Sequence, residues 1–407
     1  MLDKVFEVAV GRWVDRAKAV ADLPIELTLW SGQAYKLGNF DEPVVRLRVA
    51  DSSVVPALLN PSLDTLGEAY VQQKLDVEGE LTAVIDVAYK LAQVEGDQPG
   101  FAARLAKRVT HSKKEDEEAI QYHYDVSNEF YQLWLDKRMV YSCAYFERGD
   151  ETLEQAQLKK IDHILNKIRI VPGNTLLDIG CGWGALVIRA AERFGIKCVG
   201  ITLSERQFEL ARERVAAAGL CHLVDIRLQD YRDVTGTFDR ITSVGMFEHV
   251  GLANLPSYFS KLQRLLVDDG VALNHGITST DAESGDTPFG GGTFIDKYVF
   301  PAGELPHISM ALKCMQEGGL EVLDVENLRR HYMKTLQMWA SEYERHGSQI
   351  REMLGEQKYR IWRVYLAGCA HAFSVDNVAI FQVLCQKSGR PAVSIPNSRK
   401  YMYASPL

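Results

Sequence analysis

The stretch with the clearest chemical potential runs from Thr175 to Gly184 and reads TLLDIGCGWG. An apolar run ends in Asp178 and is followed by glycines at alternating positions, Gly180, Gly182 and Gly184. This pattern predicts a buried strand that enters a tight turn before a helix. Glycine allows the unusual backbone angles of such a turn and lets a ligand approach the main chain closely. The stretch therefore predicts a ligand site, unless the glycines serve packing alone.

The spacing of these glycines narrows the class of ligand. It departs from the dinucleotide pattern GxGxxG, and no GxxxxGK[ST] phosphate loop follows. Asp178, two residues before the first glycine, suits a polar or cationic ligand better than a pyrophosphate, which an anion would repel.

Further reactive side chains stand at the ends of later apolar runs. We expect strands at 197–202, 224–228, 238–245 and 270–277, with helices between them. Strands that alternate with helices predict a parallel doubly wound sheet, in which ligands bind beyond the carboxyl ends of the strands. The residues expected to gather on that rim are Gly180, Thr202, Asp230, Glu248 and His275.

Local signals delimit several elements around this rim. Ser204 and Gln207 have the spacing of a capping box, and Gly219 is placed to end the helix that follows. Nearer the C-terminus we expect helices around 336–343 and 352–373 and a strand at 379–385.

The first 95 residues predict a small mixed α/β domain. Apolar residues recur at helical spacing from Leu2 to Val20, strand-like alternation follows at 25–30 and 44–49, and helical patterns occupy 63–94. The first helix is either a membrane-surface anchor or an element that packs on its own domain.

The segment 96–118 has the composition of a linker. It contains glycine and proline, then a basic run from Arg104 to Lys114, then an acidic patch. The cations could meet an anionic lipid surface or could simply be solvated.

An aromatic-rich block leads from this linker toward the glycine turn. It runs from Tyr122 to Tyr131 and from Met139 to Phe146 and is dense in Tyr, His, Asp and Cys. Packing alone would not need so many hydrogen-bonding groups, so we expect a lid over the site; a structural aromatic cluster is the alternative.

The composition sets outer limits on function. The chain has 407 residues, of which 46% are hydrophobic and 25% charged, so two domains are expected. A net charge of −8 argues against a general nucleic-acid binder. Seven scattered cysteines without a CxxC pair, and no histidine cluster at zinc spacing, indicate reduced cytosolic thiols and no metal site. No signal-peptide layout and no apolar run of about 20 residues is present, so we expect a soluble or peripheral protein.

Taken together, the motifs resemble a known family. Asp178–Gly184 is similar to motif I of class I S-adenosylmethionine-dependent methyltransferases. More narrowly, from about residue 119 onward the chain resembles the cyclopropane-fatty-acyl-phospholipid synthases and their mycolic-acid relatives. Seven stretches carry that resemblance, in the family's order: His123–Asp125, Tyr141–Phe146, Asp178–Gly184, Thr202–Gln207, Met246–Gly251, Phe294–Pro301 and Tyr332–Trp339.

The resemblance implies both a fold and a domain plan. The fold would be α/β, a doubly wound, mainly parallel, seven-stranded Rossmann-like methyltransferase sheet beside a smaller N-terminal mixed α/β domain. Residues 1–95 would be a lipid- or membrane-associating domain, 96–118 a linker, and 119–407 the S-adenosylmethionine-dependent catalytic domain. Residues 278–310 would cap the acyl chain.

The implied reaction is transfer of a methyl group from S-adenosylmethionine to a cis double bond of an unsaturated phospholipid acyl chain. An alkene is a poor nucleophile, so the enzyme's task is chiefly positioning. Methyl transfer leaves a carbocation, and loss of a proton from the added methyl closes a cyclopropane ring. In the family the base for that proton is a bound bicarbonate ion.

Catalytic roles carry over by motif to Cys143, Glu248, His275 and Tyr332, and these residues with Ile277 would hold the bicarbonate. Glu248 and His275 would tune and relay the proton. Cys143 would have a positioning role, because no step of the reaction requires a covalent bond to its thiol. The alternatives are structural: a helix-start carboxylate, a strand-end histidine and a core tyrosine. Asn274 and Gly276 flank His275 where the family has an apolar residue and a small hydroxyl or similar.

The cofactor site carries over in the same way. Tyr141 and Ser142 would close over it, the glycines would admit the methionine part, and Thr202 and Gln207 would face the ribose and adenine side. The residues so implied are Tyr141, Ser142, Asp178, Gly180, Gly182, Trp183, Gly184, Thr202, Leu203, Ser204, Gln207, Asp230 and Tyr231.

The remaining expectations concern partners and product. We expect a cytoplasmic enzyme, peripheral at the inner face of the membrane, in contact with phospholipid and not with nucleic acid, and the family adds a possible homodimer. Two alternatives stay open. One is a fatty-acyl C-methyltransferase that makes methyl-branched or methylene chains, and the other is a catalytically silent lipid-binding homologue.

Overall fold

The computed structural model describes residues 2–20, 22–95, 126–282, 292–299, 304–390 and 395–403. Its contacts divide the chain into two compact units. Unit 1 comprises residues 1–108, 286–301 and 343–375, and unit 2 comprises 109–285, 302–342 and 376–407. The predicted linker at 96–118 and the His123–Asp125 motif lie outside the described residues.

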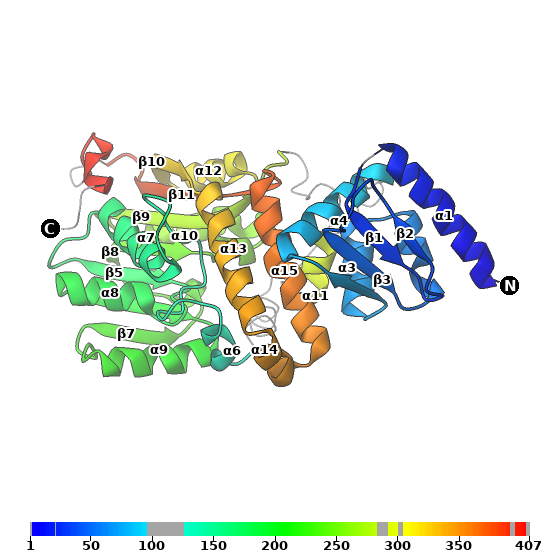
Figure 1. The fold of residues 1–407 in the computed structure, drawn as a ribbon. Helices are drawn as coiled ribbons and strands as arrows, with labels where there is room; N and C mark the ends of the chain where they lie inside the picture. The colour runs from blue at the N-terminus through cyan, green and yellow to red at the C-terminus, as the bar shows by residue number, and fades with distance from the viewer. Residues whose placement is uncertain are drawn as a thin grey trace. The chain divides into compact units, whose positions relative to one another are not determined.

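Unit 2 is built on a seven-stranded sheet in the order β10-β11-β9-β8-β5-β6-β7 (Figure 1). Strand β11 runs antiparallel to β9 and β10, whereas the pairs from β9 to β7 are parallel. The predicted doubly wound, mainly parallel α/β sheet is thus confirmed. Its strands are β5 (Thr175–Ile179), β6 (Lys197–Thr202), β7 (Val224–Leu228), β8 (Phe238–Val244), β9 (Leu266–Ser279), β10 (Leu320–Asn327) and β11 (Val378–Lys387).

Helices cover both faces of this sheet and create two hydrophobic cores. One core joins α7, α8 and α9 to the sheet, and the other joins α10 and α12 to the opposite face. Burial on both faces explains why the parallel strands read as short apolar runs. The helices of unit 2 are α6 (Asn128–Gln132), α7 (Leu153–Lys167), α8 (Ala185–Phe194), α9 (Glu205–Ala217), α10 (Leu255–Leu265), α12 (Ile308–Glu317) and α13 (Arg329–Arg345), with short 3₁₀ turns η3 (Tyr231–Asp233), η4 (Phe247–His249), η5 (Leu252–Asn254) and η6 (Arg399–Tyr403).

The start of α9 departs from the sequence prediction. Ser204 caps the helix by accepting a hydrogen bond from the backbone nitrogen of Gln207, but the reciprocal half of the capping box is absent. The Gln207 side chain instead accepts a hydrogen bond from Thr202. The residue that would have completed the cap is therefore directed elsewhere.

Unit 1 contains a four-stranded mixed sheet in the order β2-β1-β3-β4. Helix α1 buries Val10, Trp13 and Ala17 in the core of this unit, so it packs on its own domain, while Val5 and Val8 remain exposed. The elements of unit 1 are α1 (Leu2–Val20), β1 (Ile25–Thr28), β2 (Ala34–Lys36), β3 (Val45–Val49), η1 (Ser52–Val54), α2 (Val55–Leu59), α3 (Leu63–Val71), β4 (Leu75–Glu78), α4 (Leu81–Glu95), α11 (Gly292–Tyr298), α14 (Gly347–Leu354) and α15 (Glu356–Ser374).

Later segments of the chain complete unit 1. Arg360 of α15 donates to the carbonyl oxygens of Tyr70 and Leu75 and pairs with Asp76. In α11, Lys297 and Tyr298 bind the Glu68 carboxylate. The functional domains predicted on either side of the linker 96–118 stay a prediction. The structure adds that residues 286–301 and 343–375 belong to the same compact unit as the N-terminal residues.

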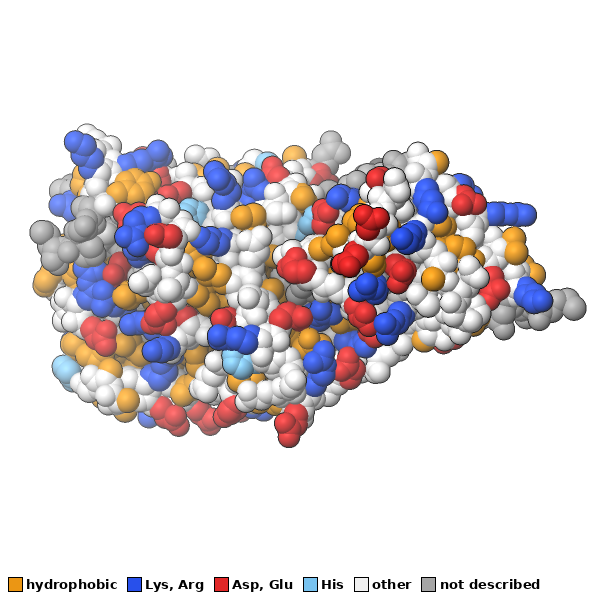
Figure 2. All heavy atoms as spheres, in the orientation of Figure 1, with side chains coloured by type: hydrophobic (Ala, Val, Ile, Leu, Met, Phe, Trp, Pro, Cys, Tyr) orange, Lys and Arg blue, Asp and Glu red, His pale blue; other side chains and the backbone are white. Residues whose placement is uncertain are grey.

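Two surface properties bear on the expected partners. Among the described helices, none is both long enough and apolar enough to cross a bilayer. Acidic and basic side chains are interspersed on the face shown in Figure 2, and neither sign gathers there into one large region.

Candidate active site

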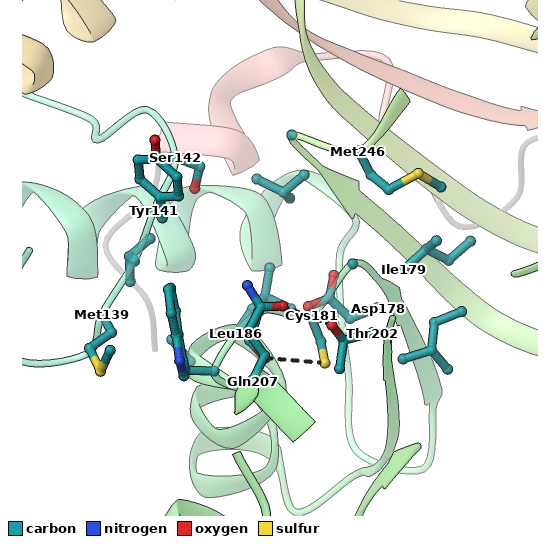
Figure 3. A pocket seen from close by; sticks show the side chains of 18 of the residues that line it. Met139, Tyr141, Ser142, Asp178, Ile179, Cys181, Leu186, Thr202, Gln207 and Met246 are labelled. Carbon is teal, nitrogen blue, oxygen red and sulfur yellow. Dashed lines mark hydrogen bonds between the residues drawn. The ribbon is translucent and has the colours of Figure 1, made fainter. Parts of the chain in front are cut away.

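The glycine turn of unit 2 borders a cavity of about 140 Å³ (Figure 3). Its walls come from the turn after β5, the end of β6, the segment 139–142 and the segment 244–249. The cofactor residues predicted from sequence that line it are Tyr141, Ser142, Asp178, Gly180, Gly182, Trp183, Thr202, Leu203, Gln207 and Tyr231.

The backbone of the turn requires glycine. Gly180, Gly182 and Gly184 all have positive φ, at 75°, 53° and 82°. An added Cβ at Gly180 would lie 3.2 Å from Cγ of Met246, which lines the same cavity. The three glycines therefore shape the turn, and Gly180 and Gly182 keep its main chain open toward the cavity.

Asp178 forms a buried acidic wall of this cavity. Its carboxylate accepts a hydrogen bond of 2.7 Å from the Thr242 hydroxyl on the neighbouring strand β8. Burial raises the pKa of Asp178 to about 6, although this hydrogen bond and the nearby Lys160 act in the opposite direction. A cationic ligand in the cavity would lower that pKa and gain from the charge.

At the end of β6, one hydrogen bond orients two cavity residues. The Thr202 hydroxyl donates to Oε1 of Gln207 at 2.7 Å, which fixes the amide so that its Nε2 remains as a donor.

Three predicted cofactor residues do not line the cavity. Gly184 and Ser204 act as N-caps of α8 and α9. Asp230 accepts hydrogen bonds from the guanidinium group and the backbone nitrogen of Arg232, while its neighbours Gln229 and Tyr231 reach the cavity wall.

The sequence interpretation missed Lys160 and Gln157, both on helix α7. Buried Lys160 lines the cavity and donates a 2.7 Å hydrogen bond to the Ser142 hydroxyl. Burial lowers the pKa of Lys160 to about 8. The Gln157 amide donates to the carbonyl oxygens of Val140 and Ser142 and so holds the segment over the cavity. A lysine and a glutamine within an amphipathic helix give no sequence signal of this role.

The four predicted catalytic residues, Cys143, Glu248, His275 and Tyr332, are not among the residues that line the cavity. Glu248 sits in η4, between the cavity residues Met246 and His249. Its Oε1 accepts a 2.6 Å hydrogen bond from the backbone nitrogen of Ile277 on β9. Burial raises the pKa of Glu248 to about 7, so it can exchange a proton near neutral pH.

His275 is fully buried in β9, level with the last residue of β8, Val244. The prediction placed it at a strand end, but β9 continues to Ser279 because it also pairs with β11. Within the part of the chain that the structure describes, neither Nε2 of His275 nor Oε2 of Glu248 has a hydrogen-bond partner. They are two of eleven such atoms among the described residues, and a small polar ligand or water could satisfy them.

Cys143 is a buried thiol. Its Sγ lies 3.2 Å from the carbonyl oxygen of Ala144, and burial raises its pKa. A raised pKa opposes formation of the nucleophilic thiolate, which agrees with a positioning role.

A chain of aromatic side chains connects Tyr332, one of the predicted catalytic residues, to the cavity at the glycine turn. Tyr332, on α13, packs edge-on against Trp339, with ring centroids 5.9 Å apart. Trp339 contacts Tyr141, and Tyr141 contacts Tyr131, which packs on Trp183 of the glycine turn. The aromatic block therefore contributes a packed cluster at the cavity, while the predicted lid motion stays a prediction.

The sheet order, the glycine turn after β5 and the acid before it define a class I methyltransferase fold. A sequence model described as "Mycolic acid cyclopropane synthetase" matches residues 111–383, and a domain of unknown function matches residues 13–95. This protein belongs to the mycolic acid cyclopropane synthetase family. It is accordingly an S-adenosylmethionine-dependent C-methyltransferase.

Individual relatives agree with this assignment. The chain is 46% identical over 371 residues to a probable fatty acid methyltransferase of Pseudomonas putida, which covers 90% of this chain and 92% of that protein. It is 38% identical over 276 residues to cyclopropane mycolic acid synthase 1 of Mycobacterium tuberculosis, covering 66% of this chain and 96% of that protein.

Solved structures give the same picture. The cyclopropane synthase MmaA2 from Mycobacterium tuberculosis superimposes with a TM-score of 0.64 at 35% identity, over 67% of this chain and 98% of that one. The mycolic acid cyclopropane synthase CmaA1, complexed with SAH and CTAB, gives a TM-score of 0.64 at 37% identity, over 68% of this chain and 99% of that one.

Proposed function

We propose that this protein methylenates a cis double bond of an unsaturated phospholipid acyl chain and so forms a cyclopropane ring. The observation that supports this most directly is the pair of buried, unpartnered atoms, Oε2 of Glu248 and Nε2 of His275, next to the cofactor cavity. Methyl transfer to the double bond leaves a carbocation, and closing the ring requires a group in this dry interior that can take up a proton.

The cavity residues fit S-adenosylmethionine, which supplies an electrophilic methyl group when bound. Asp178 would face its positive charge, the glycine turn would admit the methionine part, and Gln207 would donate a hydrogen bond on the ribose and adenine side. Lys160 and Gln157 would hold Ser142 and its neighbours over the bound cofactor.

The second half of the site fits a small anion such as bicarbonate, which would supply a proton acceptor. Its predicted holders are Cys143, Glu248, His275, Ile277 and Tyr332. Glu248, with a pKa of about 7, exists partly as an acid that can donate to an anion, and a protonated Nε2 on His275 would do the same. The Ile277 nitrogen donates to Glu248 in this structure, so it would act through that carboxyl group.

A second candidate product is a methyl-branched or methylene chain. It is favoured by the similarity to the probable fatty acid methyltransferase of Pseudomonas putida, which extends over both units of the chain. The same carbocation would then lose a different proton and give a methylene chain, which a separate reductase with a hydride-donating cofactor could convert to a methyl-branched chain.

The test is incubation of the purified protein with S-adenosylmethionine and vesicles of cis-unsaturated phospholipid, followed by mass and proton NMR spectra of the released chains. We expect a gain of one CH₂ with upfield ring-proton signals. The same mass gain with olefinic or branched-methyl signals would establish the second product. No gain with any unsaturated lipid, despite S-adenosylmethionine binding by calorimetry, would favour a silent homologue. Removal of dissolved bicarbonate should slow turnover without weakening S-adenosylmethionine binding.

The cellular site is proposed on the same basis. An enzyme that modifies chains within a bilayer must reach the membrane, so we propose a cytoplasmic protein that docks peripherally on the inner leaflet, with a homodimer as the expected assembly. Co-sedimentation with anionic and neutral vesicles and the mass in solution would test these two points.

A further inference from the structure

A row of three polar side chains crosses the sheet of unit 2 next to the proposed reaction centre. The antiparallel register pairs Glu326 of β10 with Gln382 of β11, and Gln382 with His275 of β9. Residues directly opposite one another in antiparallel strands place their side chains on the same face, about 5 Å apart. Gln382 and His275 are fully buried, on a face where Leu384 and Leu273 belong to the apolar core.

Burying polar side chains in an apolar core costs free energy unless they form hydrogen bonds. Nε2 of the Gln382 amide lies 3.0 Å from Nδ1 of His275. In this amide orientation Nε2 of Gln382 donates to Nδ1, so a neutral ring carries its proton on Nε2, while Oε1 of Gln382 has no partner among the described residues. Nε2 of the His275 ring also has no partner among the described residues.

Most of the groups around the ring oppose a second proton. Helix α7 presents Lys160, His163 and Lys167, which lower the pKa of His275, whereas the carboxylate of Glu326 on β10 acts in the opposite direction. Burial, together with the two lysines, holds the pKa of His275 well below its ordinary value. The remaining titratable groups of the predicted site are Cys143, Tyr332 and Glu248. The carboxyl group of Glu248 accepts a hydrogen bond from the backbone nitrogen of Ile277, which lies two residues after His275 in β9.

The far end of the row is a fixed anion. Glu326 Oε2 accepts a hydrogen bond from His163 at 2.9 Å and forms an ion pair with Nζ of Lys167 at 2.5 Å, and Oε1 accepts a hydrogen bond from Tyr403. Burial would raise the pKa of Glu326, but His163 and Lys167 lower it to about 2. The neutral amide of Gln382 therefore stands between a permanent carboxylate and the imidazole.

We propose that Gln382 is a positioning residue that locks His275 as the neutral Nε2–H tautomer, so that His275 donates a hydrogen bond to the small anion of the reaction and leaves the proton exchange to Glu248. This inference rests on the proposed function, and it changes the role expected for His275 from proton relay to fixed donor. A carboxylate at position 382 would accept a hydrogen bond from Nδ1–H and reverse the tautomer.

The direct test is nitrogen-15 NMR of protein labelled in its ten histidines, with His275→Gln identifying the signal of interest. We expect the wild-type His275 ring to be the Nε2–H tautomer from pH 6 to pH 8. We expect Gln382→Glu to convert it to the Nδ1–H tautomer or to imidazolium. A wild-type ring that is Nδ1–H or charged in that range would overturn the proposal, as would a Gln382→Glu spectrum identical to that of the wild type.

Turnover gives a second readout. Gln382→Glu should lower kcat by about 10-fold or more and add a new ionisation to its pH profile, with S-adenosylmethionine affinity unchanged because residue 382 does not line the cavity. If that variant does not fold, Gln382→Met decides the question, since an apolar neighbour of similar volume should leave a mixture of tautomers. An Nε2–H ring that stays unmixed in Gln382→Met would contradict the lock.

The matched control is Gln386→Leu, four residues further along β11 on the same face of the sheet. Gln386 is also buried, but its amide binds Glu321 and not the imidazole. It should lose stability without any change in the His275 signal. The NMR measurement uses protein without substrate, so its outcome does not depend on which product the enzyme forms. If the Nε2–H tautomer is confirmed but no cyclopropane is found, only the proposed function is overturned.

Discussion

At the scale of single residues, Glu248 is the group best placed to exchange a proton during the reaction. Replacing it by Gln keeps its size and the hydrogen bond from Ile277 but removes the ionisation. We expect Glu248→Gln to lower kcat by about 100-fold or more while the dissociation constant of S-adenosylmethionine, measured by calorimetry, changes little. Equal losses in turnover and affinity would instead place Glu248 in the cofactor site.

The same carboxyl group predicts a pH dependence of stability. Burial raises the pKa of folded Glu248 to about 7, above the ordinary value of 4.5. The folded protein then holds this proton more tightly than the unfolded chain, so the stabilisation is complete below about pH 4 and is lost as the pH rises through about 7. Its size is roughly 3 kcal/mol. Urea unfolding from pH 5 to pH 8 should show a steeper decline for the wild type than for Glu248→Gln, and parallel curves would refute it.

Asp178 offers a matching prediction on the cofactor side. Thr242→Val removes the hydroxyl that donates to this buried carboxylate, so the pKa of Asp178 should rise above about 6. Loss of one such bond, about 1 kcal/mol, corresponds to a rise of about 0.7 in that pKa and so to roughly fourfold weaker S-adenosylmethionine binding at pH 5.5, where most of the carboxyl group is protonated. Binding should recover at pH 8.5, where the carboxylate ionises again. A defect of the same size at both pH values would mean that Thr242 acts through packing.

The sequence alone identifies residues of the candidate site only where a local sequence pattern indicates them. The glycines, Asp178 and the Thr202–Gln207 pair were predictable because a strand followed by a tight turn leaves a short-range signature. Lys160 was not predictable, because a lysine on an amphipathic helix usually faces water and only the packing of α7 shows this one to be buried. The roles of the catalytic set came from the family resemblance, and remain predictions.

At the scale of elements, the parallel strands of unit 2 were predicted within a few residues. In unit 1, β2 was not predicted, and β4 lies within the stretch 63–94 that was predicted as helical. The antiparallel strand β10 of unit 2 was also missed. It carries Glu321, Asp324 and Glu326, which dilute the apolar signal of a strand. Those acids are accommodated by partners distant in sequence, such as Lys167 and Arg399. The contact between His275 and Gln382 was equally hidden, since it depends on the register of two strands more than a hundred residues apart.

The turn η4, which carries Glu248, depends on a glycine in the neighbouring strand. A Cβ at Gly276 would lie 1.8 Å from the ring of Phe247, so this ring occupies the space that a side chain would fill. We expect Gly276→Ala to destabilise the protein by about 2 to 3 kcal/mol and to displace η4, with a loss of turnover. Thermal unfolding and kcat measure the two effects.

The control for that variant is Gly368→Ala in helix α15. A Cβ there meets nothing within 4 Å, and alanine is the better helix former, so a small gain of about 0.5 kcal/mol is expected. If Gly276→Ala were as well tolerated as Gly368→Ala, Phe247 would have to move freely, and η4 would not be fixed by this contact.

At the scale of the whole molecule, the chain does not divide at a single boundary. The sequence predicts a domain boundary at 96–118, because the amino-acid composition changes there. The compact units nevertheless interleave, since α11, α14 and most of the C-terminal helical region join the N-terminal residues in unit 1. Composition along the chain cannot show this, because a segment's packing partner is set by tertiary contacts.

The interleaving predicts the behaviour of a fragment that begins at residue 119. Such a fragment keeps α15 but lacks the two carbonyl oxygens and the Asp76 carboxylate that satisfy Arg360, as well as the Tyr70 hydroxyl that accepts from Arg363. It also exposes the apolar side of α15 that packs on α3 and α4. We therefore expect residues 343–375 to be cleaved rapidly by trypsin in the fragment and slowly in the full chain, while S-adenosylmethionine binding persists because every cavity-lining residue is retained. The control is Arg360→Met in the full chain, which should weaken only unit 1. Equal protection of α15 in fragment and full chain would show that this helix is stable without residues 1–95.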